Sequence, residues 1–194
     1  MEGMILPGEV AWYVTGRFYA ATGGALRDAG YFVHLQGVEG LFSGEPGEKT
    51  ARLTFLAEPF TAKSLKNGDL ALSLDAPGDF CVYLNREPAR FDDPDSFGAG
   101  EEIARFRRVS VVMGTKVGTG PGDRALFSLN VFSARLVSSR PFELDGRHYD
   151  LRALMPHGIT QWGTSVATPT GNLPGYTSVI PFVGSAIAIG GGNG

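Results

Sequence analysis

The sequence predicts an all-β fold, either an antiparallel barrel or a sandwich of about ten strands with little helix. Run after run alternates apolar and polar residues at every second position, which is the period of a β-strand. The runs end in turns, and the 28 glycines and 12 prolines of the 194-residue chain supply such turns. One all-β domain over residues 1–194, with 190–194 as a flexible tail, is the expected organisation.

Ten strands are expected, and the alternation of apolar and polar residues locates each of them along the chain. The first is the clearest, because Trp12 and Val14 share one face whereas Tyr13 and Thr15 share the other. The remaining runs are recognised by the same period and by the turn residues that separate them. In chain order the expected strands are 9–20, 30–42, 50–57, 69–75, 79–86, 102–114, 123–138, 140–150, 158–168 and 176–190.

Several middle runs are short or apolar on both faces. Residues 50–57 and 69–75 are short runs of alternating apolar and polar residues, each bounded by polar turns. Residues 79–86 contain a continuous apolar run around Cys81, which indicates a buried strand with an inert thiol. Residues 123–138 carry apolar side chains on both faces, a pattern typical of a strand that is covered twice or lines a mixed cavity.

The C-terminal third contains the clearest turn, Asp145-Gly146, because Asp-Gly is preferred in the two-residue turn of a hairpin. The strand at 158–168 follows a corner at His157. The last strand, 176–190, is weakly polar throughout, so it is either central in the sheet or covered by a partner. Helix is expected only as a turn or two, at 22–28, 61–66 and 97–104.

Composition narrows the classes of function. A net charge of −3 argues against nucleic acid as a partner, because phosphate binding needs clustered cations. No apolar run is long enough for a spanning helix and no secretory signal is visible, so no membrane partner is expected. The lone Cys81 has no second thiol for a disulfide, which favours a reducing compartment and a cytoplasmic location.

One acid–base patch is predicted on the Asp-Gly hairpin. A two-residue turn places Glu143 opposite His148, and Asp150 lies two residues further on the same side. A carboxylate beside an imidazole orients its tautomer, as general acid–base catalysis requires. The alternative is an exposed hairpin with an ordinary charge pair.

The other two histidines are also candidates. His34 lies within an apolar strand, where it is either a cavity-facing base or a core side chain. His157 occupies a corner next to an aromatic strand, where it is either a ligand contact or a turn residue. No histidine pair has the spacing of metal ligands, so neither a metal nor a cofactor is expected.

A binding cavity is the leading functional hypothesis, because aromatics make up 11% of the residues and occupy both faces of several strands. Isolated polar residues among large apolar ones would anchor a ligand there. The expected lining residues are Trp12, Tyr13, Tyr31, Gln36, Asn130, His157, Gln161 and Trp162.

A basic cluster follows a long acidic loop. Arg105 and Arg107 share one face of the expected strand, where they could grip a carboxylate or phosphate, and Arg108 takes the opposite face. Pairing with the acidic loop 87–102 is the simpler explanation. That loop contains Phe91 and Phe97, which suggests a lid over a barrel mouth, and a merely solvated loop is the alternative.

Three functions remain open. The chain is predicted to be a β-barrel that binds a small, largely hydrophobic molecule. The first alternative is a cofactor-independent isomerase, cyclase or lyase that uses a histidine–carboxylate pair. The second is a structural protein, a homo-oligomer whose weakly polar strands pack against copies of themselves.

Overall fold

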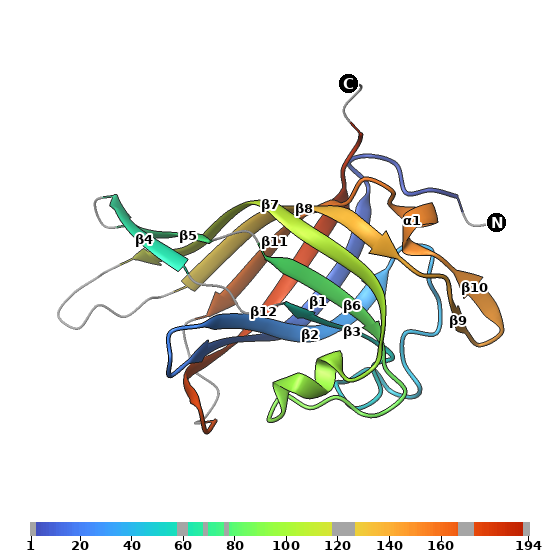
Figure 1. The fold of residues 1–194 in the computed structure, drawn as a ribbon, viewed down its shortest axis with the longest axis horizontal. Helices are drawn as coiled ribbons and strands as arrows, with labels where there is room; N and C mark the ends of the chain where they lie inside the picture. The colour runs from blue at the N-terminus through green and yellow to red at the C-terminus, as the bar shows by residue number, and fades with distance from the viewer. Residues whose placement is uncertain are drawn as a thin grey trace.

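A computed structural model describes residues 3–57, 62–67, 70–75, 78–117, 127–166 and 173–191. Strands dominate these residues, with one short α-helix and one 3₁₀-helix (Figure 1). The elements are β1 (Val10–Ala21), β2 (Leu26–Leu35), β3 (Leu53–Ala57), β4 (Ala62–Asn67), β5 (Leu70–Asp75), β6 (Asp79–Leu84), η1 (Pro94–Gly98), β7 (Glu101–Val117), β8 (Phe127–Ser139), β9 (Phe142–Leu144), β10 (Arg147–Tyr149), α1 (Leu151–Leu154), β11 (Ile159–Val166) and β12 (Tyr176–Ala188).

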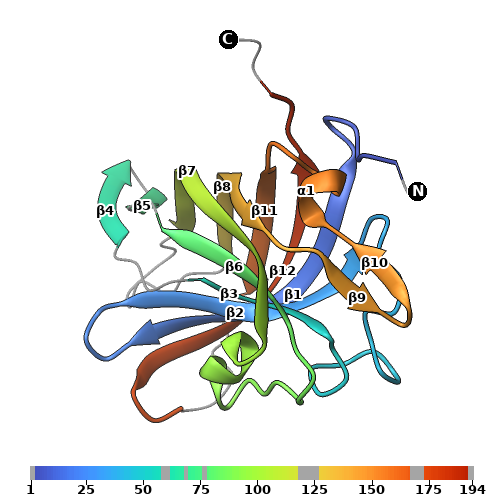
Figure 2. The same ribbon diagram turned by 45° about the vertical axis from the view of Figure 1, so that its right-hand side comes forward.

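Eight antiparallel strands close into a barrel. Their order is β7-β6-β3-β2-β1-β12-β11-β8, and pairing of β7 with β8 completes the circle (Figure 2). The β4–β5 hairpin pairs with the far part of β7 and lies at one end of the barrel, opposite α1 and the β9–β10 hairpin (Figure 1). The all-β prediction is therefore confirmed, and closure decides for the barrel over the sandwich.

Most expected strands are present with bounds that differ by a few residues. The largest difference is β2, which begins at Leu26 rather than at residue 30 and ends at Leu35 rather than at residue 42. Residues 123–126 of the seventh expected strand and 192–194 of the expected tail lie outside the described residues. The strand 176–190 is central, because β12 pairs with β1 on one side and β11 on the other.

The three helix predictions were mostly wrong. Residues 22–28 form the β1–β2 turn and the start of β2, and β4 occupies 62–67. Residues 97–104 divide between η1 and β7. Where β2, β4 and β7 form, pairing with a neighbouring strand outweighs the weak local preference.

The short helix α1 was not predicted. It is a single turn capped by the Asp150 carboxylate, which accepts a hydrogen bond from the Arg152 amide at 2.9 Å.

The barrel interior is packed with aromatic rings. Trp12 stacks on Phe80 with ring centroids 6.1 Å apart and meets Phe32 edge-on at 5.3 Å. Phe80 also contacts Phe55 at 5.0 Å and Phe132 at 6.0 Å. All five side chains are 2% exposed or less. Because each buried ring removes a large apolar area from water, this cluster is the main source of the barrel's stability.

A glycine pair in β1 and β2 lies where neighbouring atoms leave no room for a side chain. Gly16 lies opposite Gly30 in the register of these strands. A Cβ on Gly30 would overlap the carbonyl oxygen of Thr15, and one on Gly16 would lie 2.5 Å from the carbonyl oxygen of Ala29. Neither position has room for a side chain, so this part of the wall requires glycine.

The acidic loop does not cover a barrel mouth. Phe97, from η1, is fully buried against the outside of the wall, where its carbonyl accepts a hydrogen bond from the Thr54 hydroxyl at 2.6 Å. Tyr19 donates to the carbonyl of Phe91 at 3.0 Å, and burial raises the pKa of its phenol. The lid prediction is therefore wrong, because the loop's aromatics find a second apolar cluster on the outer face of β1, β2 and β3.

Replacing Gly30 by alanine tests the close approach. We expect Gly30→Ala to lower the free energy of unfolding by ~3 kcal/mol, because the added methyl group meets backbone that cannot move aside. Gly23→Ala is the matched control, since nothing lies within 4 Å of a Cβ at that position. Urea unfolding of both variants measures the difference, and equal stabilities would contradict the close approach.

Candidate functional site

The candidate site is a group of polar side chains inside the otherwise aromatic barrel. Asp28, Arg108 and Gln161 are buried, at 3%, 2% and 0% exposed, and the Oδ1 atom of Asn130 is also buried. These residues come from β2, β7, β11 and β8. Each occupies an inward position of its strand, so the alternation that places aromatics inside also places these groups there.

Gln161 is held by Trp12. The indole Nε1 donates to Gln161 Oε1 at 2.9 Å, which fixes which end of the amide is oxygen. The other end, Nε2, is buried and has no hydrogen-bond partner in the described part of the chain. A buried amide donor without a partner costs about 1–3 kcal/mol.

Asn130 lies beside it on the neighbouring strand. It pairs in register with Gly163, and a Cβ on Gly163 would lie 2.5 Å from Asn130 Oδ1. Gly163 pairs in turn with Gly184, where an added Cβ would lie 3.4 Å from Gln161 Nε2. The two amides therefore occupy the space that this glycine pair leaves free. Asn130 Oδ1 also has no hydrogen-bond partner among the described residues.

A buried ion pair adds charge to the same interior. Arg108 Nη2 lies 2.8 Å from Asp28 Oδ1, and the guanidinium stands over the Phe132 ring at 4.8 Å from its centroid. Burying two charges is costly, and the pair is tolerated because each charge is neutralised and hydrogen-bonded. Phe132 connects this pair to the aromatic core.

The two amides offer one hydrogen-bond donor and one acceptor. A buried donor on Gln161 and a buried acceptor on Asn130 lie over one glycine pair, next to a large apolar surface. A hydroxyl, a carboxylic acid or an amide can satisfy both atoms at once. None of the three histidines belongs to this group, because all three are exposed.

The expected lining residues divide between the two sides of the wall. Trp12, Asn130 and Gln161 face the interior. Tyr13, Tyr31 and Trp162 face outward, so they cannot line an interior cavity, and their placement in one cavity with Trp12 was wrong. The reason is the two-residue period itself, because Tyr13 neighbours Trp12 and must point to the opposite face. Tyr31 packs outside against Phe42 and Phe91.

His34 and Gln36 line a surface pocket of about 440 Å³ near the N-terminal segment. Both side chains are exposed, and the His34 ring lies 5.7 Å from that of Tyr13. The pocket's two carboxylates have other partners: Glu9 accepts from the Leu6 amide, and Glu39 pairs with Arg147. His34 is therefore not a cavity-facing base in the barrel. His157 is exposed at its corner, beside Gly191.

The acid–base patch does not assemble as expected. Glu143 lies opposite His148, so the hairpin register is confirmed, and both side chains are exposed. Asp150, in contrast, caps α1 and accepts a hydrogen bond from the Ser139 hydroxyl. Its carboxylate is committed to that turn, because the chain leaves the hairpin strand at Tyr149 and enters the helix.

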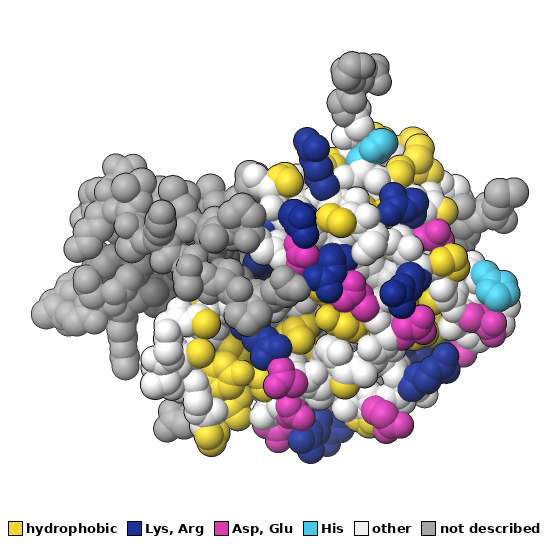
Figure 3. Space-filling model, in the orientation of Figure 1, with side chains coloured by type: hydrophobic (Ala, Val, Ile, Leu, Met, Phe, Trp, Pro, Cys, Tyr) yellow, Lys and Arg dark blue, Asp and Glu magenta, His cyan; other side chains and the backbone are white. Residues whose placement is uncertain are grey.

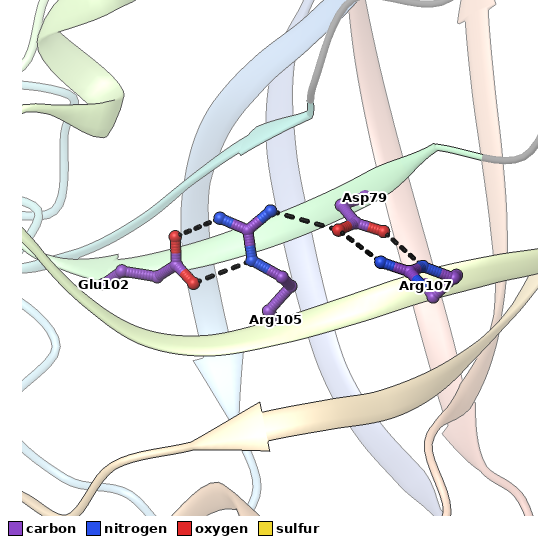
Figure 4. Close-up of polar contacts among 4 residues, drawn as sticks. All are labelled: Asp79, Glu102, Arg105 and Arg107. Atoms are coloured by element: carbon purple, nitrogen blue, oxygen red, sulfur yellow. Dashed lines mark hydrogen bonds and ion pairs between the residues drawn. The ribbon is translucent and has the colours of Figure 1, made fainter.

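Arg105 and Arg107 belong to a surface ion-pair network (Figure 4). Asp79 accepts from Arg107 Nε at 3.0 Å and from Arg105 Nη1 at 3.0 Å. Arg105 also forms a two-pronged pair with Glu102, at 2.9 and 2.6 Å. The expected pairing with the acidic loop 87–102 is confirmed only for Arg105 with Glu102, because Asp79, the partner of both arginines, lies in β6. The hydrogen bond from Arg107 is the main cause that lowers the pKa of Asp79 below its ordinary value, and Arg105 adds to it.

A second surface pocket, of about 610 Å³, lies between the loop at 43–52, the segment after β6 and the β9–β10 turn. Its lining mixes cations with anions, and Arg52 pairs with Asp145 there at 2.7 Å. Glu143 is part of this lining rather than of a catalytic patch.

Sequence reasoning missed Asp28 and Arg108 as interior residues. The signal was present for Arg108, because alternation put it on the face opposite Arg105 and Arg107, and that face is the interior. Asp28 fell in a segment expected to be helical. Within the described ranges no cluster of three metal-ligating side chains occurs, and no helix there has the length and apolarity to span a bilayer.

Comparison with known proteins adds no relative: no family model matches the chain, and neither the curated proteins nor the solved structures contain a significant match.

The Asp79 network predicts a pH-dependent stability. Because the pKa of Asp79 is lower in the folded state, its contribution is present above the unfolded-state pKa of about 3.9 and is lost as the pH falls through the folded value. We expect Asp79→Asn to cost about 1–2 kcal/mol at neutral pH and progressively less below about pH 4.

Urea unfolding across this pH range measures the effect. Asp145→Asn is the matched control, because its ion pair with Arg52 is exposed and contributes only a few tenths of a kcal/mol. A cost for Asp79→Asn that does not change with pH would argue against the assigned role of this carboxylate.

Proposed function

We propose that the barrel binds a small, largely apolar molecule carrying one hydroxyl, carboxylic acid or amide group. The observation that carries the proposal is the pair of buried, unpartnered amide atoms, Gln161 Nε2 and Asn130 Oδ1, in an aromatic interior. Buried polar atoms almost always have a partner in native proteins, so such a pair calls for one. A ligand with a donor and an acceptor supplies it.

The surroundings specify the rest of the ligand. The buried rings of Phe132, Phe80 and Trp12 pack on one another in the same interior, and such an apolar environment favours a largely apolar ligand. The Arg108–Asp28 pair keeps the charge of the interior balanced. Burial of the apolar body would provide most of the affinity, and the two amides would set its orientation. The cytoplasmic location stays a prediction.

Trp12 provides a direct reporter for this site. The chain has two tryptophans, so Trp162→Phe leaves Trp12 as the only one, and its indole is bonded to the amide that would meet the ligand. We would titrate this variant with aromatic alcohols and acids, each paired with the analogue that lacks the polar group. The proposal predicts saturable changes in Trp12 emission and tighter binding of the polar member of each pair.

A pair of amide substitutions tests the assignment. Asn130→Leu removes the acceptor without touching the Trp12–Gln161 bond, and we expect it to weaken binding of the polar probes about tenfold, the equivalent of ~1.4 kcal/mol. Gln36→Leu is the matched control, because this amide is exposed on the surface. Equal affinity in both variants, or no saturable binding of any probe, would contradict the proposal. Native mass spectrometry of freshly purified protein would show whether a molecule of this class is already bound.

A further inference from the structure

The two unpartnered amide atoms of the interior make different demands on a ligand. Because the Trp12 indole donates to Gln161 Oε1 at 2.9 Å, the oxygen of this amide is already bonded, and the remaining atom, Nε2, is a donor. Asn130 Oδ1 is an acceptor. Both atoms are buried and have no hydrogen-bond partner among the described residues. A group that satisfies both must therefore accept one hydrogen bond and donate another.

One small group can contact both atoms, because they border the same pair of glycines. Gly163 and Gly184 are register partners, and Cβ atoms at such positions lie about 5 Å apart. A Cβ on Gly163 would lie 2.5 Å from Asn130 Oδ1, and one on Gly184 would lie 3.4 Å from Gln161 Nε2. The donor and the acceptor thus lie close enough for a single carboxamide or hydroxyl group to bond both.

Charged side chains lie mostly on the outside of the barrel. Basic and acidic side chains are intermixed on the face over β6 and β7 (Figure 3). Asp79 is buried there, and it accepts hydrogen bonds from Arg105 and Arg107 on the outer side of these strands. Among the described residues, the other buried charged side chains are Asp28 and Arg108. The charge of the described interior therefore comes from these two.

This interior offers a ligand no net charge. Arg108 Nη2 lies 2.8 Å from Asp28 Oδ1, so this cation and this anion neutralise each other. An ionised carboxylate that entered beside them would remain without a counter-charge of its own. Burying an unpaired charge is so costly that a carboxyl group binds a proton instead. A neutral group does not carry this cost.

We propose that the interior site selects a neutral group that both accepts and donates a hydrogen bond, namely an amide, a hydroxyl or a protonated carboxylic acid. An ionised carboxylate is rejected, because it has no proton for Asn130 Oδ1 and its charge stays unpaired. A ketone is rejected because it only accepts, and a site built to bond a donor discriminates against the analogue that lacks it. This selectivity rests on the proposed binding function.

Three probes of the same shape test the selectivity. Benzamide, acetophenone and benzoic acid each carry one phenyl ring and one planar carbonyl group, and they differ only in whether NH₂, CH₃ or OH completes that group. At pH 7 we expect wild-type protein to bind benzamide about tenfold more tightly than acetophenone, because acetophenone leaves Asn130 Oδ1 without a donor. Calorimetric titration measures the three dissociation constants.

Asn130→Leu tests which atom reads the donor. Because this variant lacks the acceptor, its affinity for benzamide should fall about tenfold while its affinity for acetophenone stays unchanged, so that the two probes bind equally. Gln36→Leu, which changes an exposed amide, should keep the wild-type preference for benzamide. The comparison of probes on wild-type protein decides by itself if Asn130→Leu does not fold.

Benzoic acid tests the exclusion of charge. A carboxylic acid with a pKa of about 4 is almost fully ionised at pH 7, whereas about one tenth of it is neutral at pH 5. If only the neutral form binds, the apparent affinity should rise about tenfold for each pH unit between pH 7 and pH 5. Benzamide does not titrate in this range, so its affinity reports any effect of pH on Asp28, Arg108 or the rest of the protein.

The outcomes separate this selectivity from the proposed function. Acetophenone that binds wild-type protein as tightly as benzamide overturns the selectivity. Benzoic acid that binds more tightly than benzamide at pH 7, or equally at pH 7 and pH 5, also overturns it. In these cases the barrel still binds a small molecule, so the proposed function stands. Absence of saturable binding of all three probes at both pH values contradicts the proposed function and the selectivity together.

Discussion

Closure of the sheet by pairing of β7 with β8 is the constraint on which the rest of the structure depends. The register runs from Ala104 opposite Ser139 to Met113 opposite Asn130. An eight-stranded barrel has room for its own side chains or for one small ligand among them, so inward residues meet others across the axis. Rings from seven strands converge there, and the chain must use glycine where neighbouring atoms leave no room for a Cβ, as at Gly16 and Gly30.

This narrow interior makes its polar residues informative. In an interior lined by aromatic rings, a buried charged or amide side chain is costly unless another group in the protein, or a bound molecule, forms a hydrogen bond or ion pair with it. Asp28 and Arg108 form such an ion pair with each other. The Oε1 atom of Gln161 is paired with the Trp12 indole. The Nε2 atom of Gln161 and the Oδ1 atom of Asn130 have no hydrogen-bond partner among the described residues. Two kinds of polar burial thus coexist: the ion pair neutralises itself, whereas the two amide atoms have no hydrogen-bond partner among the described residues.

The alternation predicted much of this and failed where distant pairing decides. Trp12 and Tyr13 point to opposite faces because they are neighbours in one strand, and the sequence near them suffices to predict this. The turn at Asp145-Gly146 can likewise be predicted from the residues of the turn themselves. The ion pair between Asp28 and Arg108 joins positions 80 residues apart, and no local pattern reveals which inward residues meet across a closed barrel. For the same reason β4 was mistaken for a helical turn: its partners, rather than its composition, make it a strand.

β1 and β11 carry the candidate site on one face and exposed aromatic side chains on the other. Inward Trp12 and Gln161 are buried and hydrogen-bonded to each other, whereas Tyr13 and Trp162, each one residue further along its strand, are partly exposed to water. The same alternation that fills the interior with rings therefore also places rings on the outside. A high aromatic content in the sequence thus does not reveal by itself which face of the wall could bind a ligand.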